Sequence, residues 1–269
     1  MCNQIIRAVF SDVDGTLLNS DRRITRRTLD ALHMLRDQNI PFVIISARGP
    51  SGLYPILRDY DLTCPIICFS GALILSEKRE VLWQKSFPGY RAQEVVAHLA
   101  ACRFDMSVGL YSYDDWMVAD KSDPRILREE QIVKAQARQM DFRTLPCDFD
   151  VHKILCICSP KQTDTAERSL KDRFPDLSIV KSSDMLLEIM AGQVNKAEAV
   201  KRLCSLWAVN VQDAAAFGDN YNDVEMLETV GHGFLMGNAP EPLLKRIPRI
   251  TKDNDHDGIY EALRTVVQW

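Results

Sequence analysis

Short apolar runs alternate with amphipathic helical segments in the first part of the chain, and this alternation restricts the fold more than any other feature. Leu29, Leu32 and Leu35 recur at helical spacing after Thr25, which predicts a helix with a threonine N-cap. Strand, helix, strand, helix, strand is the order expected of a parallel sheet that is covered on both faces. The apolar runs of strand length in this part are Ile5–Phe10, Phe42–Ile45 and Ile66–Phe69.

The same alternation returns from Lys196 onward, where two further apolar runs of strand length lie between helical segments. The middle of the chain differs. Two apolar runs that flank the charged residues 77–80 predict a hairpin, and the clustered strands and few helices that follow are typical of an α+β module with an antiparallel sheet. We therefore expect an α/β fold in which residues 1–82 and 191–269 form a Rossmann-like parallel-sheet core and residues 83–190 form an inserted α+β domain.

The composition excludes several classes of protein. Hydrophobic residues make up 46% of the 269 positions and charged residues 26%, which is ordinary for a globular protein. The formal net charge of −4 argues against nonspecific binding to nucleic acid or to an anionic membrane. No apolar stretch reaches the length of a membrane-spanning helix, and the N-terminal segment lacks the apolar core of a signal peptide. We expect a cytoplasmic protein with reduced cysteines, no nucleic-acid or membrane partner, and a monomer as its default state.

The first strand ends in the sequence Ser-Asp-Val-Asp-Gly-Thr, which places Asp12 and Asp14 where an extended segment leaves its strand. Ligands of open parallel sheets bind beyond the carboxyl ends of the strands, so we expect the functional site to include this loop. Gly15 permits a sharp turn there. The pattern also resembles the beginning of a calcium-binding loop whose other oxygen ligands are missing, and it fits an Asp–Gly turn with two solvated carboxylates. Taken alone, the motif leaves these alternatives open.

A second acidic segment follows the apolar run at 214–217 and supplies two more carboxylates, Asp219 and Asp223. A helix N-cap explains one such residue, but not four polar side chains in six positions. Ser46 directly follows another predicted strand, where its hydroxyl can hold an anion or simply cap a helix or turn. Lys196 lies near the start of a helix, where a solvated surface lysine is the ordinary interpretation.

Together, these motifs resemble those of haloacid dehalogenase (HAD) superfamily phosphatases of the Cof type, which carry a C2-type cap domain. The resemblance extends over essentially the whole chain and includes the insertion. Three positions depart from the family pattern, because Ala47 replaces a usual glycine, Ser70 a usual asparagine, and Ala197 a glycine that often follows the lysine. None of these changes removes a reacting group. The shared motifs are, in order, Asp12–Thr16, Ser46, Lys196 and Gly218–Asp223.

The resemblance implies a role for each matching residue. Asp12 would attack phosphorus and form an aspartyl-phosphate, and Asp14 would protonate the leaving oxygen and then activate water. Asp12, the backbone carbonyl of Asp14 and Asp219 would hold Mg²⁺. A cation is also favoured on charge grounds, because four clustered carboxylates face a single lysine. The residues that would bind the phosphoryl oxygens are Ser46, Ala47, Lys196 and Asn222. Those that would support the site are Asn220 and Asp223.

Three functional hypotheses follow from this set of residues. The leading one is a Mg²⁺-dependent phosphatase of small phosphorylated metabolites, such as sugar phosphates. The alternatives are a phosphomutase, in which the aspartyl-phosphate rephosphorylates a sugar, and a sugar-phosphate binding or sensing protein with little catalysis. The inserted domain would set substrate specificity, and its Tyr111, Tyr113 and Trp116 fit either a substrate contact or ordinary strand packing.

Overall fold

The computed structural model describes residues 6–267, and the chain divides into two compact units, each with its own sheet. The first unit comprises Met1–Ala47, Ile56–Leu82 and Asn195–Trp269, and the second comprises Arg48–Pro55 and Trp83–Val194. Residues 48–55 and 191–194 thus group with the second unit, whereas the sequence pattern predicts them in the core. The start of α2 (Pro50–Asp59) lies beside the end of α4 (Pro124–Val133), because a Cβ on Gly52 would stand 3.5 Å from the carbonyl oxygen of Val133.

The sheet of the first unit is mainly parallel. Its strands, in spatial order, are β15 (His232–Leu235), β14 (Ala214–Gly218), β1 (Ala8–Ser11), β2 (Phe42–Ile45), β3 (Ile66–Cys68), β4 (Leu73–Leu75) and β5 (Val81–Gln84). Neighbours from β15 to β3 are parallel, and β4 is antiparallel to β3. The predicted α/β fold around a parallel sheet is therefore confirmed. The predicted hairpin is present too, and it extends this sheet at one edge.

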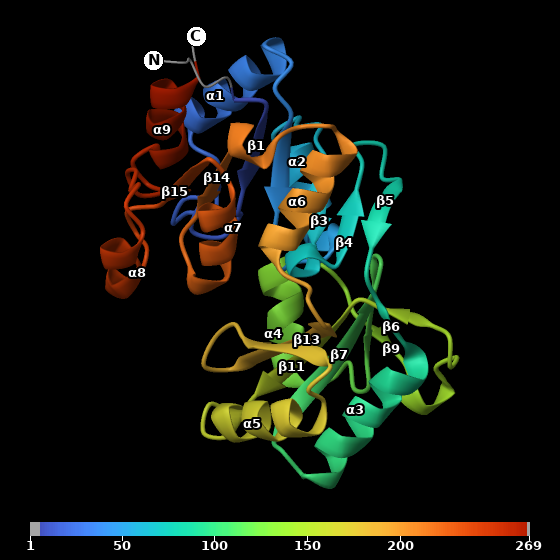
Figure 1. Cartoon of the computed structure of the whole chain (residues 1–269). Helices are drawn as coiled ribbons and strands as arrows, with labels where there is room; N and C mark the ends of the chain where they lie inside the picture. The colour runs from blue at the N-terminus through green and yellow to red at the C-terminus, as the bar shows by residue number, and fades with distance from the viewer. Residues whose placement is uncertain (1–5, 268–269) are drawn as a thin grey trace. The chain divides into compact units, whose positions relative to one another are not determined.

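The direction in which the chain crosses this sheet reverses at β1. The chain proceeds from β1 to β2 and β3 on one side, and from β14 to β15 on the other. Because parallel crossovers are right-handed, α1 (Arg26–Asp37), which links β1 to β2, and α7 (Val224–Thr229), which links β14 to β15, lie on opposite faces of the sheet. The helices of this unit beyond α2 are α1 (Arg26–Asp37), α6 (Lys196–Leu206), α7 (Val224–Thr229), α8 (Glu241–Arg246) and α9 (Gly258–Val266). Helix α1 contacts α9, and α6 contacts α7 (Figure 1).

Helix α1 and strand β2 have the boundaries that their residues predict. Thr25 is the N-cap of α1, and its Oγ1 accepts a hydrogen bond of 3.3 Å from the backbone N–H of Thr28. Leu32 and Leu35 of this helix are buried. All four residues of β2 are buried as well, as expected of a parallel strand that helices cover on both faces.

The second unit contains a separate, mostly antiparallel sheet. Its strands, in spatial order, are β12 (Leu177–Lys181), β13 (Leu186–Ala191), β11 (Lys153–Cys158), β7 (Met106–Ser112), β8 (Asp115–Val118) and β9 (Arg138–Gln139). Only the pair β8 and β9 is parallel among the described strands of this sheet. Strands β6 (Phe87–Pro88) and β10 (Asp150–Val151) form a small second sheet. The helices besides α4 are α3 (Gly89–Ala101) and α5 (Thr163–Arg173), and α5 contacts β12 and β13.

The aromatic residues of this unit pack within its sheet. Tyr111 of β7 lies directly opposite Trp116 of β8, and the two rings stack with centroids 5.5 Å apart. Both side chains are buried, and Lys153 of the adjacent strand places its Nζ 5.2 Å from the Tyr111 ring centroid. Cross-strand aromatic pairs of this kind stabilise a sheet, so packing accounts for Tyr111 and Trp116.

Within residues 6–267, no helix is both long and apolar enough to cross a membrane. The cysteines described there are free thiols, and Cys64, Cys68, Cys156 and Cys158 among them are buried. Burial raises the pKa of the Cys64 thiol to about 12. The Cys64 thiol is therefore protonated, and these four buried cysteines pack as small apolar side chains of the two cores.

Candidate active site

The two aspartate motifs leave adjacent strands at the same edge of the sheet. Strands β1 and β14 are parallel neighbours, with Ser11 opposite Phe217. The backbone N–H of Asp12 continues this ladder by donating to the carbonyl oxygen of Phe217 at 3.0 Å. This is also the place where the strand order reverses, which is the usual ligand-binding position of an open α/β sheet.

The loop after β1 packs directly against the loop after β14. Gly15 has φ of +81°, and a Cβ on this residue would stand 2.5 Å from Asp219 Oδ2. Only glycine combines this backbone conformation with such a close approach. The hydroxyl of Thr16 then donates to Asp219 Oδ1 at 2.9 Å. The sequence analysis did not predict this contact, although Thr16 stands in the motif itself.

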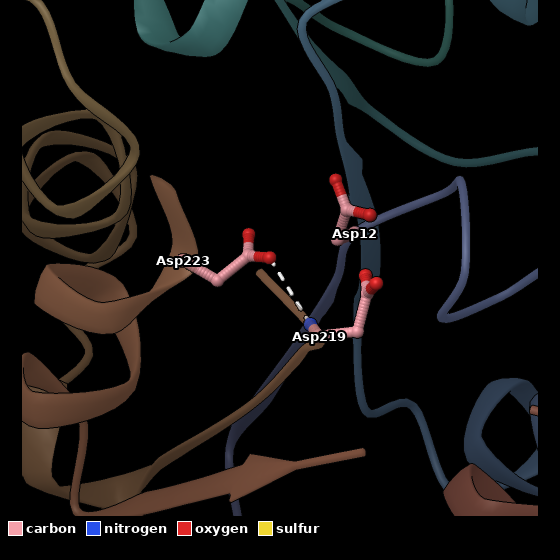
Figure 2. Close-up of side chains that lie close together, drawn as sticks. All are labelled: Asp12, Asp219 and Asp223. Atoms are coloured by element: carbon pink, nitrogen blue, oxygen red, sulfur yellow. Dashed lines mark hydrogen bonds between the residues drawn. The ribbon is translucent and has the colours of Figure 1, made fainter. Parts of the chain in front are cut away.

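Asp223 holds the second loop through its own carboxylate. Its Oδ2 accepts from the backbone N–H of Asp219 at 3.1 Å and of Asn220 at 3.0 Å, and Figure 2 shows the first of these bonds. Asn220 and Asp223 form a capping box on the short 3₁₀ helix Tyr221–Asp223. The N-cap interpretation of this segment is therefore correct, and the same residues also shape the site.

Lys196 is an interior residue and not a surface lysine. It is the first residue of α6, which Asn195 caps by accepting from the backbone N–H of Glu198 at 2.8 Å. The Lys196 side chain is 1% exposed, and its Nζ donates to Asp12 Oδ1 and to Asp223 Oδ1, both at 2.5 Å. One buried cation thus joins the carboxylates that follow β1 and β14.

The electrostatics of this cluster favour additional positive charge. Burial raises the pKa of Asp12 to about 8 despite the lowering effect of Lys196, and the neighbouring Asp223 contributes to the rise. Burial and Asp223 also raise the pKa of Asp219 to about 6. Burial disfavours the charge of Lys196, but Asp12 and Asp223 outweigh that effect and raise its pKa. The combined negative charge of the carboxylates is therefore larger than the single positive charge of Lys196 can neutralise.

The donor set fits a hard divalent cation. One carboxylate oxygen from each of Asp12, Asp219 and Asp223 lies within 4.8 Å of the others. Asp223 uses both oxygens, one for Lys196 and one for backbone N–H groups. Asp12 Oδ2 and Asp219 Oδ2, by contrast, accept no hydrogen bond from any residue that the structure describes. Asp12 and Asp219 therefore each keep an oxygen that a cation could use, whereas both oxygens of Asp223 are engaged.

The other predicted site residues differ in how deeply they are buried. Ser46 is buried directly beyond β2, the strand next to β1, and its carbonyl oxygen accepts from the N–H of Ser70 at 2.9 Å. Ala47 follows it and is half-buried. Asp14 and Asn222 are exposed on the two loops that carry Asp12 and Asp223.

Ser70 and Ala47, two of the departures from the family pattern, differ in backbone conformation. Ser70 has φ of +55°, a left-handed conformation that asparagine adopts more readily than serine. The adjacent Phe69 is also left-handed, with φ of +52°. Ala47 is not among the described residues with positive φ, so alanine replaces glycine there without backbone strain.

Comparisons with known proteins agree with this geometry. The haloacid dehalogenase-like hydrolase family profile matches residues 9–263. A Haemophilus influenzae protein, provisionally named a phosphatase, is 34% identical over 253 residues, which are 94% of this chain and 95% of that protein. The HMP-PP phosphatase of Klebsiella pneumoniae is 29% identical, over 89% of this chain and 87% of its own. A crystal structure of a haloacid dehalogenase-like hydrolase from Bacteroides thetaiotaomicron has a TM-score of 0.87 at 25% identity, covering 97% of this chain and 99% of that one.

The chain belongs to the haloacid dehalogenase-like hydrolase family. Within that family it is an enzyme of the phosphatase type, a hydrolase of phosphoric monoesters, in agreement with the names of its relatives. The family and enzyme class predicted from the motifs are therefore confirmed.

Replacing Lys196 with methionine should destabilise the protein. The variant would leave Asp12 and Asp223 buried without their shared cation, and breaking a buried ion pair on one side costs about 3 kcal/mol or more. Chemical denaturation at neutral pH measures the loss. Lys201→Met is the matched control, because Lys201 lies on the same helix with a half-exposed side chain, and its replacement should change stability by less than about 0.5 kcal/mol. Equal stability of the two variants would contradict this account of Lys196.

Proposed function

We propose that the protein is a Mg²⁺-dependent phosphatase that hydrolyses small phosphorylated metabolites, such as sugar phosphates, through an aspartyl-phosphate on Asp12. The observation that carries the proposal is the ion pair that Asp12 forms with Lys196 through only one of its carboxylate oxygens. Lys196 holds its Oδ1 at 2.5 Å, while Oδ2 accepts no hydrogen bond from the described residues. A carboxylate fixed through one oxygen can present the other to phosphorus.

The two half-reactions can be written with Asp12 and Asp14 alone as reacting groups. An Asp12 oxygen forms a bond to phosphorus as the bond from phosphorus to the ester oxygen breaks, and Asp14 gives its proton to that leaving oxygen. Water then attacks phosphorus and gives a proton to Asp14, and the bond between Asp12 and phosphorus breaks to release phosphate. The exposure of Asp14 supports this role, because a proton shuttle must reach both the leaving group and water.

The remaining predicted residues would bind the charge of the substrate. The Ser46 hydroxyl, the Ala47 amide, the Lys196 ammonium and the Asn222 amide would hold the phosphoryl oxygens. Asp12, the carbonyl of Asp14 and Asp219 would hold Mg²⁺, with Asn220 and Asp223 in support. When bound, Mg²⁺ supplies positive charge that offsets the carboxylates and the phosphoryl group.

Substrate choice is proposed to lie with the second unit as a C2-type cap domain, as expected for residues 83–190. All of the residues assigned above to chemistry belong to the first unit, so the core explains the reaction but not the identity of the leaving group. One relative is named an HMP-PP phosphatase, which supports a small phosphorylated compound as substrate. The proposal includes a monomer that acts in the cytoplasm.

Asp12→Asn should abolish phosphate release, because an amide cannot form the acyl phosphate. The assay measures phosphate released from a panel of phosphorylated sugars, nucleotides and cofactors, with Mg²⁺ and with a chelator. Asp21→Asn is the matched control, since Asp21 is an exposed aspartate on the segment that follows the motif. We expect its activity to equal that of the wild type. Metal-dependent turnover that persists in Asp12→Asn would rule out the proposed nucleophile, and isomerised sugar phosphate without free phosphate would favour a mutase.

The affinity for Mg²⁺ should strengthen as the pH rises from 6 to 8. Without metal, Asp12 has a pKa of about 8 and Asp219 of about 6, so both bind protons in this range. Metal ligation requires the deprotonated carboxylates, and the affinity should therefore rise by up to about tenfold per pH unit for each proton displaced. Calorimetry in buffers of different ionisation enthalpy measures both the affinity and the protons released. Asp12→Asn should release fewer protons, and an affinity independent of pH would contradict the assignment.

A further inference from the structure

Two asparagines from the C-terminal part of the first unit contact the loop that carries Asp12 and Asp14. Asn238 follows β15, and its Nδ2 donates to the carbonyl oxygen of Gly15 at 2.8 Å. Asn254 lies farther along the chain, and its Nδ2 donates to the carbonyl oxygen of Leu18 at 2.9 Å. The backbone N–H of Asn254 also donates to Asn238 Oδ1 at 3.2 Å, which orients the Asn238 amide.

The contact at Gly15 falls on the most adaptable peptide of the loop. Gly15 adopts φ of +81°, and a glycine can leave that conformation at little steric cost. Its carbonyl belongs to the peptide that leads into Thr16, whose hydroxyl donates to Asp219 Oδ1. A rotation of this peptide would therefore move the group that orients Asp219. The Asn238 amide opposes such a rotation by holding the carbonyl in place.

Strand β15 places Asn238 at the edge of the sheet where the catalytic loops emerge. It is parallel to β14, and the N–H of Met236 donates to the carbonyl oxygen of Gly218 at 2.9 Å. The segment around Asn254 is fixed in turn, because the N–H of Gly237 donates to the carbonyl oxygen of Lys252 at 3.2 Å. Both asparagines thus belong to backbone that the sheet holds in position.

We propose that Asn238 and Asn254 are positioning residues that hold the Gly15–Thr16 peptide, and through Thr16 the Asp219 carboxylate, in the arrangement needed for phosphate-ester hydrolysis. This inference rests on the proposed phosphatase function for its kinetic consequence. Its structural consequence, a restrained loop between Asp12 and Leu18, holds whatever the substrate.

Asparagine suits this position because it donates and accepts at once. An aspartate at 238 would keep the shape and still accept from the Asn254 N–H, but it would set an anionic oxygen against the Gly15 carbonyl. Asn238→Asp therefore tests the donor itself, while Asn238→Ala and Asn254→Ala remove one asparagine each. Ser20→Ala is the matched control, because Ser20 joins the same two segments by donating to Asp255 Oδ2 at 2.7 Å, away from Gly15.

The experiment measures kcat and KM with the best substrate of the wild type, and amide hydrogen exchange at Thr16 and Leu17 in the metal-free protein. We expect Asn238→Asp and Asn238→Ala to lower kcat by about tenfold, the effect of losing one positioning hydrogen bond, with KM within about twofold of the wild type. Exchange at Thr16 and Leu17 should be faster by a similar factor. Asn254→Ala should show a smaller loss in the same direction, and Ser20→Ala should match the wild type in both readouts.

The two readouts separate failure of this inference from failure of the proposed function. If the wild type hydrolyses none of the tested esters but the asparagine variants exchange faster at Thr16 and Leu17, the positioning role stands and the phosphatase proposal fails. If the wild type is active and the asparagine variants keep its kcat and its exchange rates, the positioning role is wrong. An equal effect of Ser20→Ala on kcat and exchange would also overturn it, because general loosening of the two segments would then suffice.

Discussion

The arrangement of the site depends on one buried ammonium group placed between two carboxylates. Lys196 is almost fully buried and joins Asp12, which follows β1, to Asp223, which follows β14. Charged groups in the interior carry a large desolvation cost, and the Lys196 ammonium offsets that cost for both carboxylates. Removal of Lys196 would leave Asp12 and Asp223 without a cation beside the Asp219 carboxylate. The first unit therefore maintains a charge arrangement that apolar packing alone would not favour.

The topology of the sheet brings these groups together. Reversal of the strand order at β1 makes the ends of β1 and β14 adjacent, so residues about 200 positions apart emerge side by side. Two short loops then fix the carboxylates through Gly15, which permits close approach, and through the capping box of Asn220 and Asp223. Asp223 thus uses both oxygens within the cluster, whereas Asp12 and Asp219 each keep one oxygen that accepts no hydrogen bond from the described residues.

Much of this could be predicted from local patterns, and the rest depends on packing. The N-cap at Thr25, the buried strand β2 and the two aspartate motifs follow from residue type and spacing, which act over a few positions. The interior position of Lys196 does not, because it depends on where α6 meets the strand ends. The grouping of residues 48–55 with the second unit likewise depends on contacts that are distant in sequence. Asn238 and Asn254 could not be predicted as site residues for a similar reason, since neither stands near an aspartate motif in the chain.

The central claim is that Asp12 becomes covalently phosphorylated during turnover. The direct measurement mixes the enzyme with a phosphate ester that it hydrolyses and quenches the reaction rapidly with acid. Peptide mass mapping then locates the phosphoryl group. The account predicts an acid-stable, base-labile phosphoryl group on the peptide that contains Asp12, formed at a rate that is at least as fast as turnover. A phosphoryl group on another residue, or turnover with the Asp12 peptide unmodified at every quench time, would contradict it.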